Sequence, residues 1–88
     1  DEALIQFKTA LKLEPNNYEV YNNIGFAFKE LRQFDEALKH FNHTLSVMPE
    51  HVKALNNRAL VYQELLKFEE ALSDFNQAIQ IICHLLST

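Results

Sequence analysis

The sequence contains one glycine, two prolines, one cysteine and no tryptophan among its 88 residues. So few turn-forming residues argue against a fold of many short strands, which places glycine or proline at most of its turns. The single cysteine, Cys83, excludes an intrachain disulfide and a multi-cysteine zinc site. These absences make helices the expected secondary structure.

Positive charge is also scarce, because eight Lys and Arg side chains stand against twelve Asp and Glu, a formal net charge of −4. This balance argues against nucleic acid or an anionic membrane as a partner, since both need a basic surface. No apolar run approaches the ~18 residues of a membrane span, and no signal peptide opens the chain. We expect an intracellular, cytoplasmic protein. Because the sequence starts at Asp1, we expect it to be an excerpt of a longer protein.

The sequence does contain an internal repeat with a period of 34 residues. A shift by this period superposes segments 1–4, 35–38 and 69–72, and it aligns Phe7 with Phe41 and Phe75. Apolar residues recur within each unit at the spacing of a helix face. We therefore predict an all-α chain of five helices with antiparallel neighbours, at residues 2–14, 18–31, 35–47, 52–65 and 69–84.

Proline and its neighbours mark the helix ends. Pro15 and Pro49 are equivalent in the repeat and stop the helices before them. Cys83 occupies the same place in the last unit, which predicts that the final helix continues past Ile81.

Polar residues offer caps at the helix starts. Asn16 and Asn17 provide an N-cap for the second helix, with Glu19 placed as the capping-box partner of Asn16. Asp35 is expected to cap the helix that begins at Glu36.

Gly25 is the only glycine, and it lies in the middle of a predicted helix, where glycine costs ~1 kcal/mol relative to alanine. Its repeat equivalent is Ala59. A small residue at both positions allows the two helices of a hairpin to approach closely. We interpret Gly25 as a packing residue.

A charged pair is predicted in the last repeat. Arg58 and Asp74 stand where the other repeat has Ile24 and His40, and both changes fall in one hairpin. Because an unpaired buried charge is costly, we expect Arg58 and Asp74 to form a salt bridge between the two helices.

The sequence offers no catalytic, cofactor or metal site. His40 and His43 are expected on the solvent side of a helix, and together with His51 they form no closed ligand set. Cys83 and His84 are adjacent on a helix and point apart, so they are not a nucleophile and its base. We expect a protein that is not an enzyme.

A helix–turn–helix unit of this length and residue spacing resembles the tetratricopeptide repeat family, and the resemblance covers essentially the whole chain. It implies a right-handed superhelical solenoid, with residues 1–17 as the second helix of an incomplete repeat, 18–51 and 52–85 as complete repeats, and 86–88 as a tail. Thr44, Arg58 and Cys83 depart from the family pattern. The residues that carry the resemblance are Tyr21, Ile24, Gly25, Phe28, Ala37, Phe41, Pro49, Leu55, Ala59, Tyr62, Ala71, Phe75 and Ala78.

The resemblance implies a concave groove, lined by the first helix of each repeat, that holds a peptide or helical segment of a partner protein. Steps of three and four residues along these helices define the groove face. Phe26 and Leu60 are apolar residues in this polar stripe and are expected to anchor the partner, unless they are partly buried against neighbouring helices. The expected partner-binding residues are Glu19, Asn22, Asn23, Phe26, Lys29, Lys53, Asn56, Asn57, Leu60 and Gln63.

Two recognition devices of the family can be compared with these positions. Asn23 and Asn57 are one repeat apart and resemble the asparagine ladder of the O-GlcNAc transferase repeats, in which amides bind a peptide backbone. Asn23 and Lys53 also match positions of the carboxylate clamp of chaperone-binding members. Asn57 stands where that clamp carries arginine, so the bidentate grip is lost and the clamp is disfavoured.

Three functions remain open from the sequence: a protein-interaction module, a structural spacer in a longer solenoid, or a regulatory repeat arm of an enzyme such as a glycosyltransferase. An exposed Phe26–Leu60 stripe favours the first, and a groove filled by the protein's own chain favours the second. We also expect self-association through exposed terminal helices. The apolar residues involved are Leu4, Ile5, Phe7 and Leu11 at one end and Ile79, Ile82, Leu85 and Leu86 at the other.

Overall fold

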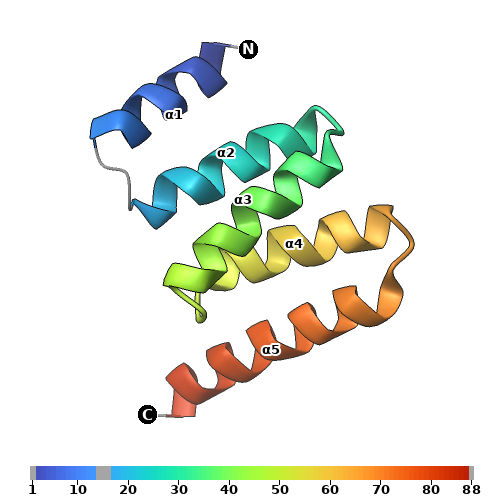
Figure 1. Cartoon of the computed structure of the whole chain (residues 1–88). Helices are drawn as coiled ribbons and strands as arrows, with labels where there is room; N and C mark the ends of the chain where they lie inside the picture. The colour runs from blue at the N-terminus through green and yellow to red at the C-terminus, as the bar shows by residue number, and fades with distance from the viewer. Residues whose placement is uncertain (1, 14–16, 88) are drawn as a thin grey trace.

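The computed structural model describes residues 2–13 and 17–87 of the chain. The described residues form five α-helices, joined by short connections, and each helix runs antiparallel to the one before it (Figure 1). The all-α prediction is confirmed, and the last helix does continue past Ile81. The helices are α1 (Glu2–Leu13), α2 (Tyr18–Glu30), α3 (Phe34–Val47), α4 (Val52–Glu64) and α5 (Phe68–Ser87).

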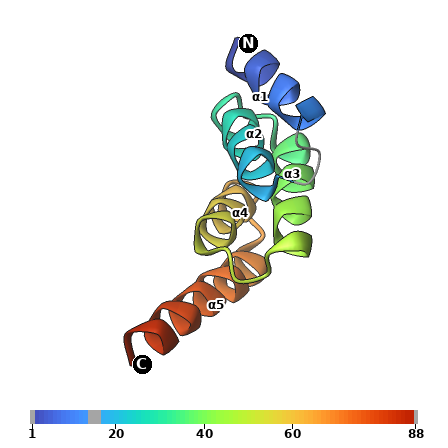
Figure 2. The same ribbon diagram turned by 90° about the vertical axis from the view of Figure 1, so that its left-hand side faces the viewer.

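The helices stack into an elongated body of 38 × 32 × 17 Å. Helices α2 and α3 form one hairpin and α4 and α5 form the next, while α4 also packs against both helices of the first hairpin. Figure 2 shows α2 and α4 as neighbours in one layer, with α3 in the other. The first helices of the two repeats therefore lie side by side, as a groove between them requires.

The apolar core consists of two clusters of buried side chains. The first cluster joins both helices of the first hairpin to α4 through Ile24, Phe28, Ala37, Phe41 and Val61. Leu4, Phe7 and Leu11 of α1 pack against this cluster, so among the predicted exposed residues of α1 only Ile5 remains largely uncovered. The second cluster joins α3, α4 and α5 through Leu45, Ala54, Leu55 and Ala78.

The helix starts differ in part from the prediction. Asn17 caps α2, and its side-chain oxygen accepts hydrogen bonds from the backbone N–H groups of Glu19 at 3.1 Å and Val20 at 3.3 Å; the predicted cap Asn16 lies outside the described residues. The prediction for Asp35 is wrong, because α3 already begins at Phe34 and Asp35 lies within its first turn. Phe34 packs against the first core cluster, which draws the helix start back by a residue.

Both hairpin turns contain a residue in the left-handed region of backbone conformation. Arg32 (φ 59°) and Leu66 (φ 62°) are repeat equivalents. The turn after α2 closes with a hydrogen bond from the N–H of Gln33 to the carbonyl of Phe28 at 2.9 Å, a Schellman-type end. Glycine usually takes the left-handed position, so the sequence gives no signal for either turn.

The packing role of Gly25 is confirmed by its contact with Phe41. A Cβ atom at position 25 would lie 2.7 Å from Cε1 of the Phe41 ring, well inside van der Waals contact. The ring is fully buried, so it would have to shift within a close-packed interior to make room. Gly25 therefore sets the distance between α2 and α3.

We predict that Gly25→Ala destabilises the protein by about 1 kcal/mol in urea unfolding. Overpacking against Phe41 costs ~1–3 kcal/mol, and the gain in helix propensity returns only ~1 kcal/mol. In a Phe41→Leu background the clash disappears, and Gly25→Ala should become stabilising. Stabilisation in the wild-type background would contradict this account.

The predicted salt bridge between Arg58 and Asp74 is present and bidentate. Nη2 and Nε of Arg58 donate to the two carboxylate oxygens at 2.7 and 2.8 Å, and Nη1 donates to Oδ1 of Asn42 at 2.9 Å. Asp74 is only 3% exposed. The hydrogen bonds to Asp74 raise the pKa of Arg58 above its usual value, against the opposing effect of burial. One guanidinium group thus connects α3, α4 and α5.

We predict that Asp74→Ala lowers the free energy of unfolding by ~2–4 kcal/mol, because it leaves Arg58 half-buried without its counter-charge. The double variant Arg58→Met, Asp74→Leu removes both charges and should lose less than Asp74→Ala alone. Asp35→Ala, at an exposed aspartate of α3, is the matched control. Equal losses for Asp74→Ala and Asp35→Ala, measured by urea denaturation, would show that the pair contributes no stability.

The prediction that His40 and His43 face solvent is wrong. The ring of His43 lies 3.8 Å from that of Tyr21, and the ring of His40 lies 5.3 Å from that of Phe28, centroid to centroid. Nδ1 of His40 also lies 2.8 Å from the carbonyl oxygen of Glu36. The aromatic side chains of α2 cover this face of α3, so both imidazoles are half-buried packing groups.

Candidate partner-binding groove

The polar stripe predicted along the first helices lines two hollows between α2 and α4. The hollow near the helix starts, here called the amide hollow, has a volume of about 340 Å³. It contains one charged side chain, Lys53, and no carboxylate. Its lining residues are Asn22, Asn23, Phe26, Lys53, Asn56 and Asn57.

The second hollow lies toward the ends of the same helices, has a volume of about 410 Å³ and is here called the charged hollow. Its charges are largely paired, with Arg32 3.5 Å from Glu64 and Lys29 3.6 Å from Glu30. Its lining residues are Lys29, Glu30, Arg32, Phe34, Leu60, Gln63 and Glu64. Together the two hollows contain nine of the ten predicted residues, all except Glu19.

The two apolar residues of the stripe are open to solvent. Phe26 is 45% exposed and Leu60 is 41% exposed, although both lie on helices that are otherwise well packed. The ammonium group of Lys29 lies 4.9 Å from the centre of the Phe26 ring, a cation–π distance. Both side chains therefore keep a large exposed fraction on this face of α2 and α4.

The asparagine side chains divide into two kinds. Asn22 is buried, and its Oδ1 accepts a hydrogen bond from Nδ2 of Asn57 at 3.5 Å, which connects α2 to α4. Asn23 and Asn56 are exposed at the wall of the amide hollow. The amides that present free donors and acceptors are therefore Asn23 and Asn56, while the contact of Asn57 across the helices is with Asn22.

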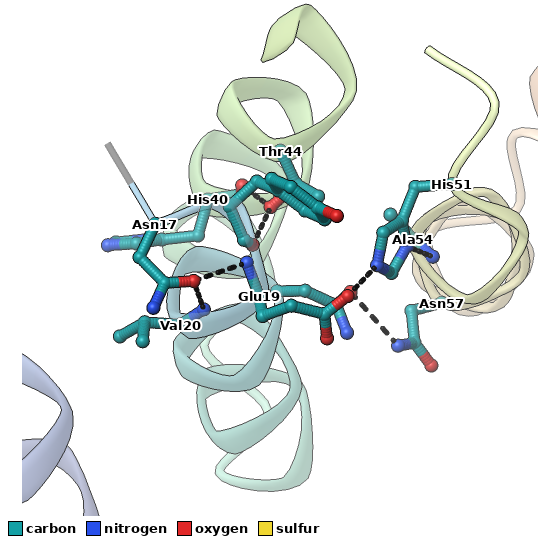
Figure 3. A network of polar contacts seen from close by, with 10 residues as sticks. Asn17, Glu19, Val20, His40, Thr44, His51, Ala54 and Asn57 are labelled. Atoms are coloured by element: carbon teal, nitrogen blue, oxygen red, sulfur yellow. Dashed lines mark hydrogen bonds and ion pairs between the residues drawn. The ribbon is translucent and has the colours of Figure 1, made fainter. Parts of the chain in front are cut away.

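Figure 3 shows the polar network that holds the start of α4 beside α2. His51 is the N-cap of α4, because its Nδ1 accepts the backbone N–H of Ala54 at 3.0 Å. The proton of the imidazole therefore lies on Nε2, which is 3.0 Å from Oε1 of Glu19. Glu19 thus contributes to the spacing of the two helices instead of lining either hollow.

The buried hydroxyl group of Thr44 holds α3 against the start of α2. Oγ1 of Thr44 donates a hydrogen bond to the carbonyl of His40 at 3.1 Å and lies 3.3 Å from the carbonyl of Tyr18, at the first residue of α2 (Figure 3). Thr44 is a departure from the family's usual alanine, and this contact explains it. Sequence reasoning missed the role of His51, although its repeat equivalent Asn17 is the N-cap of α2.

We predict that His51→Ala destabilises the protein by about 1 kcal/mol, the usual cost of losing an N-cap. His51→Asn keeps a capping oxygen but cannot reach Glu19, and it should recover most of this loss. Thermal unfolding followed by circular dichroism measures both variants. If His51→Asn is as unstable as His51→Ala, the hydrogen bond to Glu19 matters more than the cap.

The sequence profile described as tetratricopeptide repeat matches residues 16–83. The chain belongs to the tetratricopeptide repeat family. This match covers both hairpins up to residue 83, so the fold and the repeat agree with one another. A search of curated protein sequences gives no significant match.

Solved tetratricopeptide structures superpose on most of the chain. A crystal structure of MamA gives a TM-score of 0.91 at 20% identity, over 100% of this chain and 53% of MamA, and shows the fold alone. A second MamA structure gives 0.83 at 30% identity, over 92% of this chain and 48% of that one. The first TPR of Spaghetti (RPAP3), bound to the HSP90 peptide SRMEEVD, gives 0.88 at 25% identity, over 92% and 64%. The chain therefore spans about half the length of the MamA chains it matches.

The described part of the chain shows neither a metal-binding cluster nor a membrane-spanning helix. No three His, Cys, Asp or Glu side chains there come together in a way that could hold a metal ion. Among the described helices, none combines the length and apolarity needed to cross a membrane.

Proposed function

We propose that this chain is a non-enzymatic protein-interaction module that binds a linear segment of a partner protein along α2 and α4. The observation that carries this proposal is a pair of open apolar side chains, Phe26 in the amide hollow and Leu60 in the charged hollow. Partly exposed aromatic and aliphatic residues with a polar rim are typical of interface hot spots.

The side-chain amides of the groove suit a bound peptide of almost any sequence. Asn23 and Asn56 each offer a donor and an acceptor at the wall of the amide hollow, which suits hydrogen bonds to a peptide backbone. An apolar side chain of the same segment would then lie between Phe26 and Leu60. The similar repeat domain of Spaghetti (RPAP3) was solved with a peptide bound, which supports this mode of binding for the fold.

The chain's own residues favour binding over a spacer role. A spacer needs no exposed apolar side chain in its groove, and a groove filled by the protein's own chain would cover Phe26 and Leu60. Both remain exposed among the described residues. A regulatory repeat arm of an enzyme would bind its partner through the same groove. That alternative is therefore compatible with the proposed binding function. The single free cysteine suits the reducing cytoplasm, where we place the protein.

We predict that Phe26→Ala and Leu60→Ala each weaken binding of a linear peptide by about tenfold or more, as at hot-spot positions. The probe is a peptide selected on the wild-type chain from a random linear library. Its affinity for each variant is measured by calorimetry. Leu13→Ala, at an exposed leucine of α1, is the matched control and should bind normally.

Stability provides the counter-test. Both variants should unfold within ~1 kcal/mol of the wild type, because their side chains are already partly in water. A loss of ~3 kcal/mol or more would identify Phe26 or Leu60 as a core residue. Peptides that bind all variants equally well would place the binding surface elsewhere.

A further inference from the structure

The two hollows repeat one another along the valley between α2 and α4. On α2, the two asparagines of the amide hollow stand seven residues before the two charged residues, Lys29 and Glu30, of the charged hollow. On α4, the same shift of seven relates the three lining residues of one hollow to the three of the other. Seven residues are two helical turns and a rise of about 10.5 Å, so the hollows have heptad spacing. The equivalent sets on α4 are Lys53, Asn56 and Asn57 in the amide hollow and Leu60, Gln63 and Glu64 in the charged hollow.

A partner helix matches this spacing better than an extended segment does. Residues seven apart on a helix lie on one face and about 10.5 Å from each other, equal to the rise between the hollows. In an extended strand, the side chains of one face are ~6.8 or ~13.6 Å apart, and one turn of polyproline II rises only ~9.3 Å. A bound helix therefore meets both hollows in register, which neither of the other conformations does.

The apolar residues of the groove lie midway along the same valley. Phe26 follows Asn23 on α2 by three residues, and Leu60 follows Asn57 on α4 by three residues. Both apolar side chains are partly exposed. Helix residues three or four positions apart share a face, so a bound helix with one residue in a hollow has the next residue of that face at this level. One apolar side chain of a bound helix therefore reaches Phe26 and Leu60 between the two hollows.

The pair α2 and α4 already holds one helix on another face. Helix α3 packs against both and runs antiparallel to both (Figure 2). Tyr21 and Phe28 make the aromatic contacts of α2 with α3. Asn23 and Phe26 lie on a different stripe of α2, which no helix covers in the described part of the chain. The valley with the hollows can therefore accept a second antiparallel helix.

Charge and hydrogen bonding set the direction of the bound helix. The amide hollow lies near the starts of α2 and α4, where the partial charge of a helix is positive, and its one charged residue is Lys53. The end of a helix carries the opposite partial charge and four carbonyl groups without a helical partner. The exposed amides of Asn23 and Asn56 and the ammonium group of Lys53 can donate hydrogen bonds to such carbonyls. The C-terminus of a partner helix is therefore the end that suits the amide hollow.

We propose that the linear segment of the proposed function, on which this inference rests, is an amphipathic α-helix antiparallel to α2 and α4. Its last carbonyl groups accept hydrogen bonds in the amide hollow, and one apolar side chain, about one turn earlier, packs on Phe26 and Leu60. A polar side chain one heptad before the end enters the charged hollow, where Arg32 and Glu64 provide donors and acceptors. The partner is a protein that presents the end of an amphipathic helix.

The conformation is tested with a peptide of about 15 residues, long enough to form a helix, selected on the wild-type chain from a random linear library. Isotope-labelled and bound to the 88-residue chain, the peptide should show helical Cα chemical shifts over its contact region. Proline at a non-contact position between two contact residues should weaken binding at least tenfold, whereas alanine there should leave the affinity unchanged. Extended chemical shifts, or a proline that is tolerated, overturn the helical conformation.

The direction is tested with a nitroxide label at either end of the same peptide. A label at the C-terminus should broaden the backbone NMR signals of Asn23 and Lys53, and a label at the N-terminus those of Glu30 and Glu64. The reverse pattern overturns the antiparallel orientation. Lys53→Met should weaken binding about fivefold, and Lys67→Met, at an exposed lysine outside both hollows, is the matched control. Equal affinities for these two variants overturn the role of Lys53 at the helix end.

Phe26→Ala separates the helical conformation from the proposed function. A peptide that loses affinity on Phe26→Ala but binds in an extended conformation overturns the helix and leaves the groove as the binding site. Peptides that bind Phe26→Ala and the wild type equally well overturn both.

Discussion

The contact between the backbone of Gly25 and the ring of Phe41 determines how closely the first hairpin closes. Because the ring occupies the space of a missing Cβ, α2 and α3 approach until the aromatic side chains of α2 cover His40 and His43. Helix α4 then packs against both helices through Val61. The position of α4 beside α2, and with it the groove, follows from this one close approach.

The second hairpin is held by a different interaction. At the position of Ile24 it has Arg58, whose guanidinium group binds Asp74 and Asn42 in place of an apolar contact. Directional hydrogen bonds need a fixed geometry, whereas apolar packing tolerates small shifts. The neighbours α2 and α4 are likewise joined by polar links, between Glu19 and His51 and between Asn22 and Asn57. Hydrogen bonds therefore join the helices that line the groove in addition to the apolar contact that Val61 makes.

Much of this architecture could be predicted because the repeat presents each position twice. The period gave the helices, the Arg58–Asp74 pair and the extension of α5, since a departure at one position can be compared with its equivalent. The faces of His40 and His43 could not be predicted, because an imidazole packs against aromatic rings as readily as it faces water. The start of α3 was missed because the packing of partly buried Phe34 against the first core cluster outweighed the capping ability of Asp35. Spacing placed the predicted stripe on the face that lines the two hollows, but it could not separate the buried Asn22 from the exposed Asn23.

The left-handed backbone of Arg32 has a consequence for how such a repeat can diversify. Glycine would relieve the strain of this conformation, ~1 kcal/mol, yet it would remove the side chain that reaches Glu64 and lines the charged hollow. The equivalent turn residue, Leu66, projects an exposed apolar side chain from the same place. The same turn position therefore carries a cation in the first hairpin and an apolar side chain in the second. Exchange of one turn residue can alter the chemistry at the end of the groove while every helix keeps its register.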